Sequence, residues 1–290
     1  MTAGKNIVVA VRDEENGRIA LQRAMCLAHS PQDCIHLVHA SRLASMQRVM
    51  ELLTPQWVSP DAENEPDRYG WLQRLAETAD SQGPTVTFEL VNGEPGPAIV
   101  DVAVQRQADL IVVATPREGQ VREFFIGSTA LRVLRTAPCP VLVARGRITT
   151  HYQRALVGID LDEAGQRVAH AATAWLLNTN IDLVHAYRLP HEGQIRTRGG
   201  VTEEEILKLR EFVRLDHEEK LNAYRLTFPA ATIYLEHGWA ASVILDLALR
   251  LRPDILVLSK HRGTNRDERI FGSVTQFLLY ECPTDILLVP

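Results

Sequence analysis

The chain has 290 residues, a net charge of −5, 46% hydrophobic and 23% charged side chains, which is the composition of an ordinary globular protein with room for two cores. Both halves are mildly acidic, which argues against broad binding to nucleic acid or to anionic membranes. No apolar run approaches the roughly 20 residues of a membrane span, and the first apolar run is too short for a signal peptide. The four cysteines form no CxxC pair, so we expect a cytoplasmic protein with reduced thiols and no metal site.

In the first half, short β-branched and apolar runs alternate with segments of helical periodicity. Strands are expected at Ile7–Val11, Ile35–Ala40, Val86–Val91, Leu110–Ala114 and Val141–Ala144. Helices are expected at Asp13–Ser30, Pro97–Gln107 and Thr129–Arg135, and a mostly helical segment, interrupted by prolines, at about Ser41–Gln82.

The second half repeats this order of elements. Strands are expected at Ala155–Ile159, Ile181–Ala186, Thr232–Glu236, Ile255–Leu258 and Ile286–Val289. Helices are expected at Ala164–Leu177, Thr202–Leu226, Ala240–Leu251 and Val274–Tyr280, and Thr202 with Glu205 has the spacing of a capping box. Buried strands that alternate with amphipathic helices predict an α/β fold, in which helices cover both faces of a parallel sheet.

The two halves are an internal repeat. Gly93 corresponds to Gly238 with an offset of 145, and the segments "IHLVHASRL" and "IDLVHAYRLP" correspond with an offset of 146. The repeat predicts two domains, residues 1–147 and 153–290, joined by a linker near Gly146–Gln153. We expect the fifth strands, at the sheet edges, to pair the two halves as an internal pseudo-dimer, and formation of a homodimer is left open.

A Gly-Ser pair precedes the short helix after the fourth strand of each half, at Gly127-Ser128 and Gly272-Ser273. Ligands of open parallel sheets bind beyond the carboxyl ends of the strands. A helix start there offers free N–H groups and a positive dipole end to a phosphate. The alternative is an ordinary helix N-cap without a ligand, and the sequence leaves both open.

The order of strand, loop, Gly-Ser, short helix and proline-led strand resembles the universal stress protein family, as do the "LVHA" segments and "APCPVLV". The resemblance covers nearly the whole chain, and the two units resemble the tandem subclass of that family, the universal stress protein E type. It implies two adenine-nucleotide hydrolase-like (Rossmann-like) domains, each a five-stranded parallel sheet of order 3-2-1-4-5.

Members of this family that bind ATP carry Gly-x2-Gly-x9-Gly-Ser/Thr after the fourth strand. The first two glycines are replaced by Ala114 and Arg117 in the first half, and by Ser259 and Arg262 in the second. The bulk of an arginine would block a phosphate cradle, whereas its charge would clamp the phosphate. The sequence does not distinguish these two roles.

The resemblance also implies an Asp at the end of the first strand, near adenine and ribose. That position holds Arg12 in the first half and Asp160 in the second, where the alternative role is to cap the next helix. The adenine-facing backbone would fall at Ala40 and Ala186. The candidate nucleotide site therefore comprises Asp160, Ala186, Ser259, Arg262, Gly272 and Ser273, near the charge of Lys260, with Gly127 and Ser128 as a weaker, degenerate version.

These patterns favour a stress-response binding or regulatory module without enzymatic activity, which binds ATP, another adenine nucleotide or a small anionic ligand in its second half. The competing hypothesis is a structural protein that binds no nucleotide and acts through contacts with an unknown protein partner. A slow ATP hydrolase is less favoured, because the sequence identifies no carboxylate to activate water. His39 and His185 share one repeat position, and we expect both to be structural because no nucleophile is matched to them.

Overall fold

The computed structural model describes residues 4–41, 70–78, 83–115, 126–145, 151–197, 200–260 and 271–290. In the first half the elements are β1 (Asn6–Ala10), α1 (Glu14–Leu27), β2 (Cys34–Ser41), α4 (Gly70–Glu77), β3 (Thr85–Asn92), α5 (Pro95–Gln105), β4 (Leu110–Ala114), α6 (Ser128–Thr136) and β5 (Val141–Ala144). In the second half they are β6 (Arg154–Gly158), α7 (Glu163–Trp175), β7 (Asn180–Tyr187), α8 (Glu192–Thr197), α9 (Glu203–Thr227), β8 (Thr232–His237), α10 (Ala240–Leu251), β9 (Ile255–Ser259), α11 (Ser273–Glu281) and β10 (Asp285–Val289).

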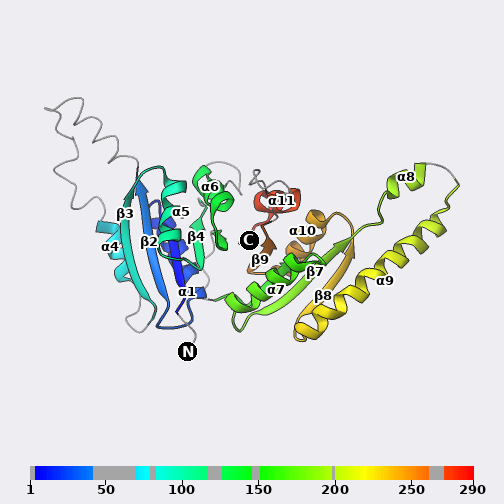
Figure 1. Ribbon diagram of the computed structural model, residues 1–290, viewed down its shortest axis with the longest axis horizontal. Helices are drawn as coiled ribbons and strands as arrows, with labels where there is room; N and C mark the ends of the chain where they lie inside the picture. The colour runs from blue at the N-terminus through cyan, green and yellow to red at the C-terminus, as the bar shows by residue number, and fades with distance from the viewer. Residues whose placement is uncertain are drawn as a thin grey trace, which may run out of the picture.

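All the described strands of both halves belong to one sheet, and the molecule is elongated along it (Figure 1). The strand order is β3-β2-β1-β4-β5-β10-β9-β6-β7-β8, so each half has the order 3-2-1-4-5 when its own strands are numbered. The predicted fold class is confirmed. The one antiparallel pair among the described strands is β5 with β10, where Leu142 lies opposite Leu287. The expected pairing of the halves through their fifth strands is therefore present.

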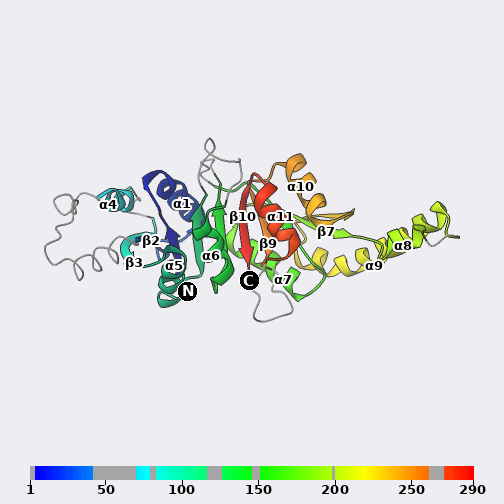
Figure 2. The same cartoon turned by 90° about the horizontal axis from the view of Figure 1, so that it is seen from above.

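Helices cover both faces of the sheet (Figure 2). Side chains of α1, α4, α7 and α9 belong to one buried cluster with alternate strand residues such as Val9 and Val157. Side chains of α5, α6, α10 and α11 belong to the other cluster, with the intervening residues Val8 and Leu156. This two-sided burial explains why the strands read as continuous apolar runs.

Local sequence explains several helix ends. Asp13 accepts a hydrogen bond from the Asn16 backbone N–H at the start of α1, and α9 begins with the predicted capping box of Thr202 and Glu205. Helix α1 ends at Leu27, earlier than predicted, because Ala28 is extended. Helix α8 was not predicted, because it has no buried side chain and therefore no apolar periodicity.

Two predictions fall partly outside the described residues. Within the expected helical segment Ser41–Gln82, α4 is helical, whereas Ser41 is the last residue of β2. Residues 42–69 and 79–82 of this segment are not among the described residues. In the expected linker, residues 146–150 also lie outside it. Among the described residues, no helix has the length and apolar character needed to cross a membrane.

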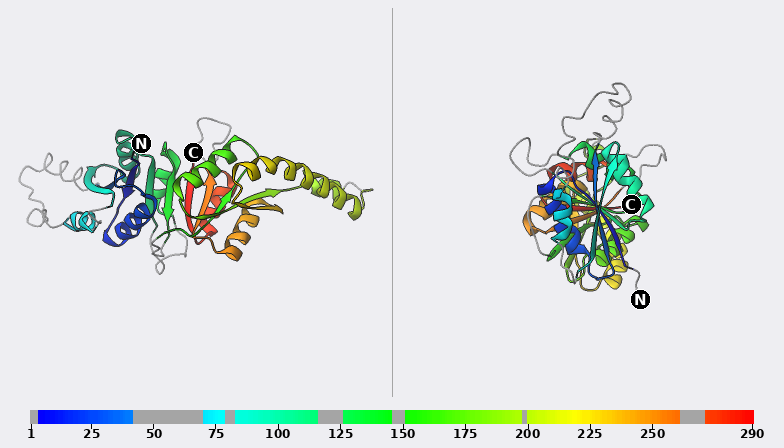
Figure 3. Two further views of the ribbon diagram at one scale, coloured as in Figure 1. Left: turned by 90° about the horizontal axis from the view of Figure 1, so that it is seen from below. Right: turned by 90° about the vertical axis from the view of Figure 1, so that its left-hand side faces the viewer.

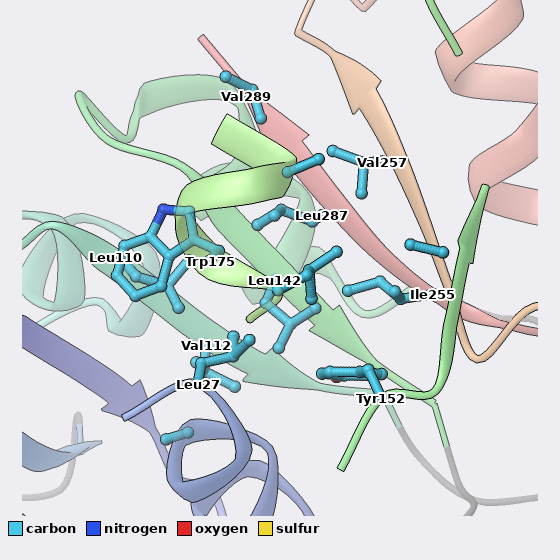
Figure 4. Close-up of a cluster of buried hydrophobic side chains, with 14 of the residues drawn as sticks. Leu27, Leu110, Val112, Leu142, Tyr152, Trp175, Ile255, Val257, Leu287 and Val289 are labelled. Atoms are coloured by element: carbon cyan, nitrogen blue, oxygen red, sulfur yellow. The ribbon is translucent and has the colours of Figure 1, made fainter. Parts of the chain in front are cut away.

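The boundary between the halves is itself a hydrophobic core. Figure 4 shows Leu142 of β5 and Leu287 of β10 beside Tyr152 and Trp175. These side chains, together with Leu110 and Ile255 of the flanking strands, are members of one buried cluster. The halves therefore share a core, which is why they form one continuous body.

A buried ionic network lies beside this core. The carboxylate of Asp285, at the start of β10, is 2% exposed and pairs with Arg23 of α1, which is 3% exposed. It also accepts hydrogen bonds from the Arg145 backbone N–H at 2.6 Å and from the Tyr152 hydroxyl at 2.8 Å. The network therefore links Arg23 and Arg145 of the first half to Asp285 of the second, and the buried carboxylate is paired, as the cost of burying an ion requires.

Candidate functional site

The candidate site lies at the carboxyl ends of β6 and β9, which are parallel neighbours in the sheet. Ala155 lies opposite Ile255 and Val157 opposite Val257. This register brings Asp160, just past β6, to the same edge of the sheet as Ser259, the last residue of β9. The structure thus brings together two residues that the sequence places far apart.

The carboxylate of Asp160 is exposed and makes no hydrogen bond with any residue that the structure describes. Helix α7 is capped by Asp162, whose side chain accepts a hydrogen bond of 2.9 Å from the Gly165 backbone N–H. The alternative role of Asp160 as a helix cap is therefore wrong. Its charge is left at the sheet edge, where a ligand hydroxyl or amine could meet it.

The backbone of Asp160, in contrast, is held tightly. Its carbonyl oxygen accepts a 2.9 Å hydrogen bond from the hydroxyl of Tyr224 on α9. A Cβ atom at Gly165 would lie only 1.9 Å from the same oxygen. Burial, followed by the charges of Asp162 and Asp160, raises the pKa of Tyr224 to about 12, so the hydroxyl stays a donor.

The start of α11 has no side-chain cap. Gly272 occupies the N-cap, and Ser273, the first helical residue, is exposed. The hydroxyl of Thr275 donates to the carbonyl of Ser259 at 3.2 Å and so holds the first turn of α11 against the end of β9. The N–H groups of that turn have no acceptor among the described residues, and such a helix start attracts anions.

Helix α6 repeats this arrangement in the first half. Gly127 is its N-cap and Ser128 is exposed. A Cβ atom at Gly127 would meet no atom within 4 Å, and the φ of −61° suits any residue, so neither packing nor backbone conformation requires glycine there. The first half differs after β1, because Arg12 is exposed and pairs with the α1 cap Asp13 at 2.8 Å. It therefore presents a cation where the second half presents Asp160.

The remaining candidates have other surroundings. Ala186 is half-buried in β7 and pairs with Glu236 of β8, while Arg117 and Arg262 lie outside the described residues. The ammonium of Lys260 donates to the carbonyl of Ala137 in the first half at 3.1 Å. Lys260 thus bridges the two halves of the chain.

The repeated histidines are structural, as predicted. Nδ1 of His39 lies 3.0 Å from the carbonyl of Val11, and Nδ1 of His185 lies 2.9 Å from the carbonyl of Ile159. Each ring therefore donates to the end of the neighbouring first strand. Nε2 of His185 is also 2.8 Å from Nδ1 of His217 on α9. The sequence showed no sign of this last contact, nor of the Tyr224 contact to Asp160.

Comparison with known proteins agrees with this architecture. The profile described as the Universal stress protein family matches residues 4–145 and 151–290. A universal stress protein of Methanocaldococcus jannaschii is 35% identical over 74 residues, which are 26% of this chain and 44% of that relative, so the match spans less than half of the relative. The universal stress protein YxiE of Bacillus subtilis is 26% identical over 144 residues, which are 48% of this chain and 97% of the relative.

Solved structures similar to the whole chain are also known. A functionally unknown protein from Pseudomonas aeruginosa PAO1 has a TM-score of 0.68 at 16% identity, with 99% of this chain and 92% of that chain covered. A universal stress protein from Archaeoglobus fulgidus has a TM-score of 0.64 at 11% identity, with 98% and 97% covered. At such identities the likeness concerns the fold alone. Because the family profile covers both halves, the chain belongs to the Universal stress protein family and carries two of its units in tandem.

Proposed function

We propose that this protein is a non-enzymatic binding module of the stress response, which takes an adenine nucleotide such as ATP, or another small anionic ligand, in its second half. The observation that carries the proposal is the exposed Asp160 carboxylate, which does not cap α7 and lies at the sheet edge that also bears the uncapped start of α11. A carboxylate and a set of free N–H groups suit the two ends of a nucleotide.

In this arrangement the backbone N–H groups after Gly272 and the hydroxyl of Ser273 hold phosphate. Asp160 accepts hydrogen bonds from ribose or base, and the backbone near Ala186 faces the adenine. Arg262 supplies a cation to the outer phosphates. The ligand stabilises the loops beyond β6 and β9, and so changes the surface that a protein partner meets.

The second candidate is a structural role without a nucleotide. It is favoured by Lys260, whose ammonium bridges to Ala137 in the first half, and by the buried Arg23–Asp285 pair, since both serve the union of the halves. Under this hypothesis the module acts through its protein surface alone.

The two candidates differ in their response to ATP. A nucleotide site raises the melting temperature in millimolar ATP, since a ligand at ten times its Kd stabilises the folded state by about 1.4 kcal/mol. Gly272→Val and Asp160→Asn should abolish this shift, whereas Gly127→Val should retain it. An unchanged melting temperature in ATP, with no nucleotide on the purified protein, would favour the structural role. Equal loss from Gly272→Val and Gly127→Val would contradict the asymmetry between the halves.

A further inference from the structure

The N-terminal half of α9 extends past the edge of the sheet, beside α8 (Figures 1 and 3). In the C-terminal half of this helix, Leu221 and Tyr224 are buried. In the projecting half Ile206 is also buried. Three other apolar side chains of that half, Leu209, Phe212 and Leu215, are 40%, 73% and 51% exposed. A contiguous apolar patch on a projecting helix marks an interaction surface, whereas single exposed apolar residues are ordinary.

The residues around Phe212 form a pattern that is almost the same in both directions along the helix. Leu209 and Leu215 lie three residues to either side, and Lys208 and Asp216 lie four residues to either side. Positions three and four apart share one face of a helix, so all of them surround Phe212. The apolar neighbours match, and the charged neighbours have opposite signs.

This pattern is self-complementary. If two copies of α9 pack antiparallel about a two-fold axis through Phe212, each Phe212 meets its own copy. Leu209 then packs on Leu215 of the other copy, and Lys208 lies opposite Asp216. A two-fold interface uses one surface patch twice, so it requires this kind of complementarity.

The charges farther from the axis extend the match. Glu204 pairs with Lys208 at 2.7 Å and Asp216 pairs with Lys220 at 2.6 Å within one helix. In the antiparallel arrangement, Glu204 lies opposite Lys220 of the other copy. Along this row of the helix the side-chain charges alternate in sign. Across the interface, each charged side chain of the row faces a side chain of opposite charge from the other copy.

One pair of like charges falls opposite in this arrangement, Glu205 with Glu219, seven residues from Phe212 on either side. The Glu205 carboxylate is already bound by the Thr202 N–H at 2.8 Å in the capping box. A patch on a single helix is smaller than the roughly 800 Å² per partner of a standard interface. We therefore expect a reversible, concentration-dependent association.

We propose that this protein forms a homodimer through the projecting half of α9, antiparallel to the same helix of a second copy, with Phe212 on the two-fold axis. The proposal is independent of nucleotide binding. It leaves the β5–β10 pairing inside each copy unchanged.

Sedimentation of the full chain over a range of concentrations tests the proposal. Wild type should show a monomer–dimer equilibrium, and Phe212→Lys should weaken dimerisation at least about tenfold. Leu226→Lys is the matched control, because Leu226 is 85% exposed on the same helix but lies outside the patch. A wild type that stays monomeric at about 0.5 mM, a concentration that populates weak complexes, would overturn the proposal. Equal dimerisation by wild type and Phe212→Lys would also overturn it.

Exchanging the charges at positions 208 and 216 distinguishes a loss of the interface from a loss of folding. Lys208→Glu alone and Asp216→Lys alone should each weaken dimerisation, because each places like charges opposite one another twice. An equimolar mixture of the two variants should recover dimers, since one variant is then acidic at both positions and meets a lysine of the other variant at each. A mixture no more dimeric than its components would overturn the antiparallel register.

Discussion

The hydroxyl of Tyr224 donates a 2.9 Å hydrogen bond to the backbone carbonyl of Asp160, 64 residues earlier in the chain. The bond joins α9 to the loop after β6, so the long helix supports the position of the candidate ligand residue. The Asp160 side chain stays exposed while its backbone is held. This division, a fixed backbone with a free carboxylate, is the arrangement that a binding residue needs.

Removal of the Tyr224 hydroxyl should therefore lower stability. We expect Tyr224→Phe to reduce the free energy of unfolding by about 1 kcal/mol, because the ring stays packed while the Asp160 carbonyl loses its donor. Urea denaturation measures the change. Tyr280→Phe is the control, since Tyr280 is 37% exposed and makes no hydrogen bond to the described residues. Equal effects of both substitutions would contradict a specific role for the Tyr224 bond.

Gly165 should not tolerate a side chain. Its Cβ would lie 1.9 Å from the Asp160 carbonyl oxygen and 2.7 Å from the Tyr224 hydroxyl, so the backbone of the loop would have to move. We expect Gly165→Ala to cost about 3 kcal/mol or more, as for severe overpacking. Gly193→Ala in α8, where a Cβ meets nothing within 4 Å, should be neutral or slightly stabilising in the same denaturation experiment.

The buried pair at the junction predicts a large loss on mutation of one partner. Asp285→Asn removes the carboxylate charge that faces the buried Arg23 guanidinium, and breaking a buried ion pair in this way costs about 3–5 kcal/mol. Exposed Asp246, which makes no ion pair with the described residues, supplies the control Asp246→Asn. Calorimetry should show a much lower melting temperature for the first variant alone. A melting temperature like that of wild type would mean that the pair does not hold the halves together.

Stability should fall on mild acidification. Burial lowers the pKa of His36, His39 and His217, so the folded protein prefers the neutral rings. Their contribution is complete above the unfolded pKa of about 6.5 and is lost as the pH falls toward the lowered folded values. The free energy of unfolding should thus decrease as the pH falls below about 6.5, above the range in which most carboxyl groups titrate.

Replacement of one of these histidines tests whether its titration causes the pH dependence of stability. His39→Asn keeps a donor for the Val11 carbonyl but cannot titrate, so its stability should change less steeply with pH over the same interval. An unaltered slope in this variant, measured by urea denaturation, would remove His39 from the explanation.

The sequence by itself was sufficient for most of the elements, for the fold class and for the duplication. Strand periodicity, the Thr202 capping box and the Gly-Ser helix starts are local patterns, and local patterns depend only on residues a few positions apart. The repeat alone puts Gly127 and Gly272 in equivalent positions. It also indicates which half keeps an acidic residue after its first strand.

Only the tertiary structure decided which of several suitable side chains caps a helix, bridges the halves or forms an ion pair. Asp160 and Asp162 are both well placed in sequence to cap α7, and only the course of the backbone selects Asp162. Lys260 reaches the first half because β10 lies against β5, an adjacency between strands that no local pattern encodes. The Arg23–Asp285 pair joins residues 262 positions apart. Contacts of this kind follow from how the two halves pack, since burial and pairing are properties of the assembled core rather than of any segment of the chain.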